Sequence, residues 1–477
     1  MAEQLTPDIC VIGAGSGGLS VAAAAAAFGV PVVLIERGRM GGDCLNYGCV
    51  PSKALLAAAK RAHALESADA FGIKAPRVKV EFPDVHAHVE SVIQAIAPND
   101  SKERFTGLGV RVIEGAARFT DRRTVVVGDA FEVRARRFVI ATGSSPAAPP
   151  IPGLNKTPYL TNESVFELTQ CPKHLIVIGA GPIGLELAQA HRRLGADVTV
   201  LEAAVPFAKD DPECAAVVLD QLARDGVVIR SGAKIAGVER ARARVRVTLE
   251  QDGGGREVLE GSHLLVATGK RANVDGLGLE EAGVDYDARG IQVDKRLKTS
   301  NKKIYAIGDV VHGALQFTHV ANYHAGLVIR NALFRLPVNA QAGVIPWVTY
   351  TDPELAHVGL REEEARARYG DIRVLRWPYH ENDRAQTERE TQGHIKMVTT
   401  KAGRIVGATI VGAHAGELIT SWTLAIGQKL KVDALLWTVV PYPTLGEIGK
   451  RAALSYYGPS LTSPWVRRII AFLRRFG

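Results

Sequence analysis

One stretch of the sequence, GGDCLNYGCVPSK at residues 41–53, indicates the fold and chemistry of this chain more directly than any other. It places Cys44 and Cys49 five residues apart, with Gly48 between them to relax the backbone. Two thiols this close can form and break a disulfide, and a short, accessible disulfide is usually labile and catalytic rather than structural. The alternatives are two inert cysteines or half of a zinc site, but no second cysteine pair completes four-thiolate ligation. The stretch therefore predicts a redox-active pair.

A dinucleotide-binding fingerprint lies just upstream of this pair. Its elements are, in order, a strand at residues 8–11, Gly13, Gly15 and Gly18 in a G-x-G-x-x-G turn, a helix at 19–28, a strand at 32–35, and Glu36. In this turn the first glycine allows a tight bend, the second lets the backbone approach a pyrophosphate, and the third allows close helix packing. The carboxylate that ends the second strand accepts a hydrogen bond from a ribose hydroxyl. We therefore expect a dinucleotide at this turn.

The same pattern occurs a second time. Its elements are a strand at residues 175–178, Gly179, Gly181 and Gly184, a helix to residue 194, a strand at 198–201, and Glu202. In both copies the first glycine precedes the acid by 23 residues. Two glycine-rich turns that bind nothing are the alternative, but two fingerprints with full strand–helix–strand context predict two bound dinucleotides. Two dinucleotides and a dithiol in one chain indicate an electron relay.

The 41–53 stretch resembles the active-site signature of the class I pyridine nucleotide-disulfide oxidoreductases, whose members include lipoamide dehydrogenase, glutathione reductase and mercuric reductase. The resemblance extends from about residue 6 to about residue 450 and implies FAD at the first fingerprint and a nicotinamide nucleotide at the second. It implies an α/β fold with two Rossmann-like domains and a C-terminal α+β dimerisation domain, in a two-fold homodimer. The expected parts are the FAD-binding domain at 1–150 and 271–343, the NAD(P)-binding domain at 151–270, the dimerisation domain at 344–462, and a basic amphipathic helix at 463–477.

The resemblance also implies roles for single residues. Cys49 faces the flavin as the charge-transfer thiolate, Cys44 attacks the substrate, and Lys53 and Glu186 form an ion pair beside the flavin. The tripeptides at 141–143 and 267–269 resemble the family's crossings between domains, and Asp309 matches an aspartate that binds the ribityl chain. The residues implied for FAD are Gly13, Gly15, Gly18, Glu36, Gly42, Lys53, Thr142, Gly143 and Asp309. Those implied for the nicotinamide nucleotide are Gly179, Gly181, Gly184, Glu202 and Gly269.

Glu202 bears on the choice of nucleotide. A carboxylate at the end of this strand accepts from a 2′-hydroxyl and repels a 2′-phosphate. The following residues, 203–209, offer only Lys209 as a cation, whereas relatives that use NADPH usually place arginines here. The sequence therefore favours NADH over NADPH.

The stretch at 441–447 resembles a His-Pro-Thr-x-x-Glu motif that reaches into the partner's active site in this family. Tyr442 occupies the histidine position, while Glu447 retains the glutamate. A tyrosine with a reference pKa near ~10 is a poor general base at neutral pH, although it can donate a hydrogen bond or act as an acid. Mercuric reductases also carry tyrosine here, but they use a C-terminal cysteine pair, and no cysteine follows Cys214. The acceptor is left open: a disulfide or other small electrophile, a metal ion, or a quinone or protein partner.

Composition and charge exclude several classes of protein. The net charge is +8, of which residues 448–477 supply six basic and no acidic side chains, so that 8 − 6 leaves +2 for the rest. No basic stripe with interleaved aromatic residues crosses the main body, which argues against nucleic-acid binding. The acidic Glu3 and Asp8 argue against a secretory leader, and Gly29 and Pro31 interrupt the uncharged run at 19–35. We expect a cytoplasmic protein, and we expect His312, His319 and His324 to be structural rather than metal ligands.

The last residues predict a short helix with two unlike sides. At about 100° per residue, one side collects Trp465, Ile469, Phe472, Leu473 and Phe476, and the opposite side collects all four arginines. Pro464 suits the first helical turn, with Ser463 as its cap. The apolar side is expected to pack on the dimerisation domain, to bind a membrane surface, or to bind a protein partner. In the second case the enzyme is membrane-peripheral.

Overall fold

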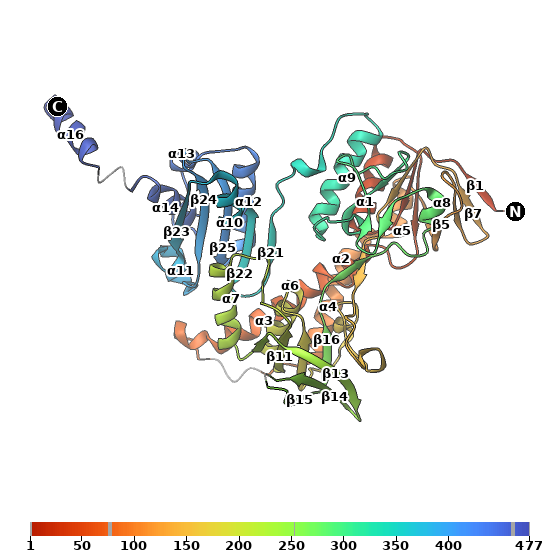
Figure 1. The fold of residues 1–477 in the computed structure, drawn as a ribbon, viewed down its shortest axis with the longest axis horizontal. Helices are drawn as coiled ribbons and strands as arrows, with labels where there is room; N and C mark the ends of the chain where they lie inside the picture. Colours follow the sequence, from red (N-terminus) through yellow and green to blue (C-terminus); the bar gives the residue numbers. More distant parts are fainter. Residues whose placement is uncertain (1, 75–78, 252, 459–462, 477) are drawn as a thin grey trace. The chain divides into compact units, whose positions relative to one another are not determined.

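The computed structural model describes residues 2–74, 79–251, 253–458 and 463–476 (Figure 1). The chain forms two compact units. The first unit contains Met1–Ala203 and Arg230–Gly343, and the second contains Ala204–Ile229 and Val344–Gly477. The five parts predicted from the sequence are a finer division and stay a prediction.

The first fingerprint forms a parallel five-stranded sheet in the order β20-β8-β2-β3-β4. Its strands are β2 (Ile9–Ile12), β3 (Val32–Glu36), β4 (Arg111–Glu114), β8 (Arg137–Ile140) and β20 (Ile304–Ala306). β2 is buried along its whole length, as expected for a parallel strand covered on both faces. Helices α1 (Ser16–Ala27) and α9 (Thr318–Ala332) contribute to one hydrophobic core with this sheet. Because β20 pairs with β8, a segment that follows the second fingerprint returns to complete the first sheet.

Smaller elements surround this sheet. They include a four-stranded sheet, β1 (Glu3–Leu5), β7 (Phe131–Val133), β6 (Val125–Val127) and β5 (Ala117–Phe119), and the helices α2 (Gly42–Asn46), α3 (Cys49–Glu66), α4 (Phe82–Ile96), α5 (Lys102–Gly107) and α8 (Leu279–Ala282). The short strands β18 (Tyr286–Asp287) and β19 (Gly290–Ile291) pair with each other.

The second fingerprint repeats the parallel arrangement. β10 (His174–Ile178) lies between β11 (Asp197–Glu202) and β16 (His263–Val266), and helix α6 (Pro182–Arg193) follows the glycine turn. An antiparallel sheet of β13 (Lys234–Ala241), β14 (Arg244–Glu250) and β15 (Arg256–Gly261) precedes β16 in the chain. The return to the first sheet passes through β17 (Lys270–Ala272), which pairs with β9 (Ser144–Pro146). β12 (Val228–Ser231) spans the division between the two units.

The second unit is built on an antiparallel five-stranded sheet. Its order is β21 (Trp347–Thr349), β22 (Glu354–Gly359), β25 (Ile405–Gly412), β24 (His394–Thr400) and β23 (Ile372–Pro378). The helices of this unit are α7 (Pro212–Arg224), α10 (Glu362–Tyr369), α11 (Asp383–Glu388), α12 (Ala415–Gly427), α13 (Val432–Leu436), α14 (Glu447–Ser455) and α16 (Pro464–Leu473). β25 is buried along its whole length, and Trp422 of α12 and Ile448 of α14 share its core.

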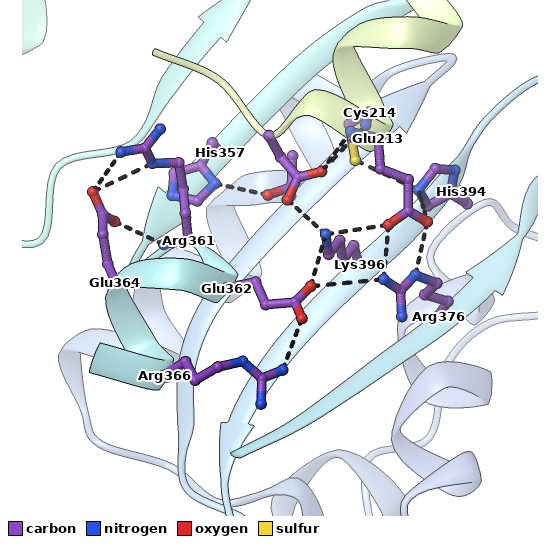
Figure 2. Close-up of polar contacts among 12 residues, drawn as sticks. Glu213, Cys214, His357, Arg361, Glu362, Glu364, Arg366, Arg376, His394 and Lys396 are labelled. Carbon is purple, nitrogen blue, oxygen red and sulfur yellow. Dashed lines mark hydrogen bonds and ion pairs between the residues drawn. The ribbon is translucent and has the colours of Figure 1, made fainter. Parts of the chain in front are cut away.

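A buried charge network joins α7 to this sheet, although α7 follows the second fingerprint in the chain (Figure 2). Lys396 on β24 is 5% exposed, and its Nζ lies 2.8 Å from Asp211, 3.1 Å from Glu213 and 3.1 Å from Glu362. Both carboxylate oxygens of Glu213 accept from Arg376 at 2.7 Å. Asp211 also caps α7, because its side chain accepts from two backbone N–H groups of the first turn. These pairs satisfy a lysine that would be costly to bury alone.

The terminal helix α16 begins with Pro464 in its first turn, as predicted. The predicted cap is wrong in detail, because Ser463 occupies the N-cap position but its side chain makes no capping hydrogen bond. No residue of α16 is buried in the single chain, and the three alternatives for its apolar side stay predictions. Within the described residues, no helix is both long and apolar enough to cross a membrane. The cytoplasmic location stays a prediction.

Candidate active site

The two cysteines of the 41–53 stretch lie on consecutive helices. Cys44 is in the short helix α2 and is half-buried, whereas Cys49 is the first residue of α3 and is exposed. The Asn46 side chain ties the end of α2 to the residues before Cys44, because its Nδ2 donates to the carbonyl oxygens of Met40 at 3.0 Å and Gly42 at 2.9 Å. A cysteine at a helix N-terminus is favoured as thiolate by the N–H groups and the helix dipole.

Gly42 brings this segment against the first fingerprint. Its φ is +59°, and a Cβ on it would lie 2.7 Å from the Cα of Gly15. A side chain would therefore force the two loops apart, so glycine is required for their close approach. The dithiol consequently lies beside the first predicted dinucleotide site.

Hydrogen bonding shifts the pKa values of the two thiols in opposite directions. The Cys44 and Cys49 thiols are hydrogen-bonded to each other, and the Cys49 sulfur lies 3.5 Å from the Thr318 hydroxyl at the start of α9. The hydrogen bond from Cys44, with help from Thr318 and the charge of Lys53, lowers the pKa of Cys49 to about 6, although the protein around the sulfur partly desolvates it. The same hydrogen bond and burial raise the pKa of Cys44 well above its usual value. At neutral pH the pair therefore holds one proton on Cys44 and a thiolate on Cys49.

Lys53 and Glu186 form the ion pair expected from the sequence. The lysine Nζ lies 2.8 Å from Glu186 Oε2, and the Glu186 side chain is only 6% exposed. Lys53 is one turn beyond Cys49 on α3, while Glu186 is on α6, which follows the second glycine turn. The pair thus ties the dithiol helix to the second fingerprint.

A second ion pair at the dithiol was not predicted. Lys270 Nζ lies 2.5 Å from Asp43 Oδ2, and the lysine side chain is 14% exposed. Asn162 donates to the other Asp43 oxygen at 3.2 Å and to the carbonyl of Tyr47 at 3.3 Å. Burial alone would lower the pKa of Lys270. Its pKa is nevertheless raised by the charge and hydrogen bond of Asp43 and by the charges of Asp309 and Cys49. Lys270 is therefore a second cation whose charge interacts with Cys49, and it is more buried than Lys53.

The first glycine turn has the shape that a dinucleotide requires. A Cβ on Gly18 would meet the carbonyl oxygen of Gly13 at 1.9 Å, whereas a Cβ on Gly15 would meet nothing within 4 Å. Space is thus left only on the outer side of the turn, at the N-terminus of α1, whose first turn has no acidic residue. Glu36 at the end of β3 accepts from the backbone N–H of Ala14 at 2.5 Å and of Gly38 at 2.7 Å. These residues fit the adenosine and pyrophosphate of FAD.

The remaining residues expected at FAD lie at or near residues 141–143, where the chain is expected to pass from the FAD-binding part to the nucleotide-binding part. The Thr142 hydroxyl donates to the carbonyl of Asn273 at 2.8 Å, and the backbone N–H of Asn273 donates to Gly143 at 3.0 Å. Asp309 accepts from the Ser144 hydroxyl at 2.7 Å, and burial raises the pKa of its carboxyl group. A buried carboxylate that accepts a neutral hydroxyl can accept from further hydroxyl groups, such as those of a ribityl chain.

The second glycine turn repeats the geometry of the first. A Cβ on Gly184 would lie 2.1 Å from the oxygen of Gly179, while one on Gly181 would meet nothing within 4 Å. Glu202 at the end of β11 accepts from the backbone N–H of Ala180 at 2.7 Å. The carbonyl of Gly269 accepts from the backbone N–H of Ala147 at 3.0 Å. This hydrogen bond joins the second expected crossing, residues 267–269, to the segment that follows the first.

In the second unit, Tyr442 is 70% exposed, and its hydroxyl donates to Asp383 Oδ2 at 2.8 Å. This hydrogen bond, with the charges of Asp383 and Glu447, raises the pKa of Tyr442. Glu447 is the first residue of α14. Tyr442 is thus held as a neutral phenol, which can donate a proton but cannot readily accept one. Asp383 was not predicted, because it is 59 residues away in the chain.

His312, His319 and His324, which were expected from the sequence to be structural, each contact a different residue. Buried His324 accepts at Nδ1 from the Gly308 N–H at 3.2 Å, His312 lies 3.1 Å from Asp287, and His319 stacks on Phe317. Within the described part of the chain, no group of three or more His, Cys, Asp or Glu side chains could hold a metal ion.

Comparison with known proteins identifies the class. The family model of pyridine nucleotide-disulphide oxidoreductases matches residues 7–325, and the model of their dimerisation domain matches residues 345–453. The chain is 37% identical to a mercuric reductase of Lysinibacillus sphaericus, covering 94% of this chain and 82% of the relative. It is 38% identical to a dihydrolipoyl dehydrogenase of Thermus scotoductus, covering 93% and 95% respectively.

A solved structure is similar over nearly the whole chain. The HOCl-induced flavoprotein disulfide reductase RclA of Escherichia coli superposes with a TM-score of 0.85 and 27% identity, covering 94% of this chain and 99% of that one. The fold and the glycine turns thus define a flavoprotein oxidoreductase with a dimerisation domain. The chain belongs to the pyridine nucleotide-disulphide oxidoreductase family, as the resemblance implied. FAD and a pyridine nucleotide are the cofactors of this family, and its dimerisation domain supports a homodimer.

Proposed function

We propose that this enzyme passes electrons from NADH, through FAD and the Cys44–Cys49 pair, to a disulfide or another small electrophilic acceptor. The observation that carries the proposal is the position of the two cysteines: Cys49 begins α3 with its sulfur 3.5 Å from the Thr318 hydroxyl, and Gly42 brings their segment against the first glycine turn. Bound FAD would supply a hydride acceptor next to the nucleotide and an electron donor next to the dithiol. The chain's own residues then determine which sulfur reacts with the acceptor.

The pKa order assigns the two sulfurs different tasks. Cys49 is the thiolate at neutral pH, and its position at the start of α3, one turn before Lys53, suits the sulfur beside the flavin. Cys44 keeps the proton and is the sulfur proposed to meet the acceptor. In a disulfide exchange, Cys44 forms a mixed disulfide with one half of the acceptor, and its proton passes to the first departing thiolate. Cys49 then attacks Cys44 and releases the second, so that the oxidised pair returns and two electrons have been transferred.

The second departing thiolate needs a proton from another group. By resemblance to the family, Tyr442 of the partner subunit supplies this group in the homodimer. Its raised pKa favours a proton donor over a base, because a base would have to be deprotonated near neutral pH. Asp383 accepts the hydrogen bond of the same hydroxyl and orients it.

Nucleotide choice rests on Glu202. The carboxylate at the end of β11 already accepts a backbone N–H, and its negative charge disfavours a 2′-phosphate. We therefore propose NADH as the preferred reductant.

A second candidate is reduction of a metal ion. Relatives named mercuric reductase and a Cu(II) complex of the RclA structure favour it. Mercuric reductases hand over the metal through a C-terminal cysteine pair, whereas in this sequence no cysteine follows Cys214. Cys214 itself is buried and has a raised pKa, so it is not suited to that role. The dithiol itself remains a soft ligand for such an ion.

Steady-state NADH oxidation with a panel of disulfides, Hg²⁺ and quinones tests these alternatives. Cys44→Ser should abolish turnover of disulfides and of metal ions, because both need the Cys44 sulfur. Quinone reduction should survive in that variant, since a flavin can reduce a quinone directly. Full disulfide turnover by Cys44→Ser would refute the proposed relay.

A further inference from the structure

The apolar side of α16 is exposed along its length. Its exposed fractions are 69% for Trp465, 55% for Phe472, 57% for Leu473 and 74% for Phe476. The rings of Phe472 and Phe476 pack edge to face with centroids 5.2 Å apart, which makes one apolar surface of them. Contiguous exposed apolar surface of this kind marks an interaction site rather than part of a core.

The opposite side of α16 carries only positive charge. At about 100° per residue, Arg467, Arg468, Arg474 and Arg475 lie together in one arc that contains no aromatic residue. From residue 448 to the end of the sequence there is no acidic residue to neutralise them. A helix with aromatic and aliphatic residues on one side and arginines on the other fits an anionic lipid surface.

The length of the helix and its place in the chain support the same conclusion. Ten residues rise about 15 Å, half of the roughly 30 Å of a hydrocarbon core, so α16 is suited to lie along a bilayer. The match to the dimerisation domain ends at residue 453, so α16 is not part of the two-domain enzyme that the family models describe. A segment outside the catalytic fold can bind a surface without disturbing that fold.

We propose that α16 binds the enzyme reversibly to anionic membranes. Its apolar side enters the boundary between headgroups and acyl chains, and its arginines contact the phosphate and carboxylate groups of the lipids. One short helix gives weak binding, but the two copies of a homodimer act together and raise the affinity of the whole enzyme. This proposal is independent of the electron acceptor.

Sedimentation of the full-length FAD-loaded enzyme with vesicles tests it. The vesicles are phosphatidylcholine alone, or phosphatidylcholine mixed with phosphatidylglycerol, at low and at high salt. Binding should require phosphatidylglycerol and fall with salt, because exposed charges are screened. Replacing the two arginines of α16 and the two that directly follow it by glutamine should lower partitioning by roughly six hundredfold, since each arginine near such a surface contributes about fivefold. Trp465→Ser with Phe472→Ser should also prevent binding.

The matched control is Arg240→Gln with Arg242→Gln, which removes exposed charge from β13 and its turn but leaves α16 intact. This control should bind like the wild type. The oligomeric state of each variant is measured by light scattering. The proposal is overturned if the wild type stays in the supernatant with anionic vesicles at low salt, or if the α16 variants still bind. It is also overturned if those variants become monomers, because α16 would then be a contact between protomers.

Discussion

At the scale of single residues, the chemistry depends on how the surroundings of Cys49 favour its ionised form. Cys44 and Thr318 hydrogen-bond to the sulfur, and Lys53 adds a positive charge. Their combined effect exceeds the cost of partial burial and places the pKa of Cys49 at about 6. The thiolate is therefore present above about pH 6 and is lost as the pH falls through that value.

Thr318→Val should raise the pKa of Cys49. Losing a hydrogen bond to a charged sulfur costs the thiolate about 1.5 kcal/mol, which corresponds to roughly one pH unit. The measurement is the pH dependence of the long-wavelength thiolate–FAD absorption in the two-electron-reduced enzyme. Thr318→Ser is the control and should titrate like the wild type. An unchanged titration in Thr318→Val would mean that the hydroxyl does not stabilise the thiolate.

Tyr442→Phe should slow acceptor reduction while reduction of FAD by NADH stays at the wild-type rate. Removing a proton donor from such a step costs about a hundredfold or more. Tyr442→His should increase turnover of dithiol substrates, because a base with a pKa near ~6.5 is restored. Stopped-flow measurement of the two half-reactions separates these effects. If both variants reduced the acceptor at the wild-type rate, Tyr442 would have no part in proton transfer.

At the scale of elements, the strand–helix–strand units determine where the nucleotides bind. Each places a carboxylate at the end of its second strand, and in both copies it accepts the N–H of the alanine in the glycine turn. These units were predictable because their signal is local, with 23 residues between glycine and acid. The contacts of Cys49 with Thr318 and of Asp43 with Lys270 join residues 269 and 227 positions apart, so only the folded chain reveals them.

Glu202→Arg, at the end of β11, should shift the preference from NADH toward NADPH. The change removes a repulsive charge and adds a phosphate partner, and we expect a shift in the ratio of the two kcat/KM values of about a hundredfold. Glu202→Gln removes only the repulsion and should give a smaller shift. A wild-type enzyme that already favoured NADPH tenfold would contradict the assignment.

The packing of α7 was also beyond sequence analysis. Its residues fall in the part expected from the sequence to bind NAD(P), 151–270, yet Lys396 on a distant strand binds Asp211 and Glu213 at its start. Lys396→Met should lower the free energy of unfolding by about 3–5 kcal/mol, because it leaves neighbouring carboxylates without their shared cation. Lys401→Met is the control, since its ion pair with Asp371 is exposed and should contribute less than about 1 kcal/mol. Equal losses in urea unfolding would show that the network does not hold α7.

At the scale of the whole molecule, the sequence predicted the α/β class, the two nucleotide turns and the family. It did not predict that residues 204–229 group with the C-terminal sheet, because buried charge pairing leaves no periodic pattern in a sequence. Nor did it decide between the alternatives for α16, whose amphipathic pattern suits both a packed and a surface-bound helix. Several apolar side chains of that helix are exposed, and what covers them stays a proposal.

The relay through Cys44 and Cys49 is tested most directly by counting electrons. Anaerobic titration of the purified enzyme with dithionite should consume about four electrons per FAD, two for the flavin and two for the disulfide. Cys44→Ser and Cys49→Ser should each consume about two, because only the flavin is then reduced. Uptake of about two electrons by the oxidised wild type, or of four by either variant, would contradict a redox-active pair.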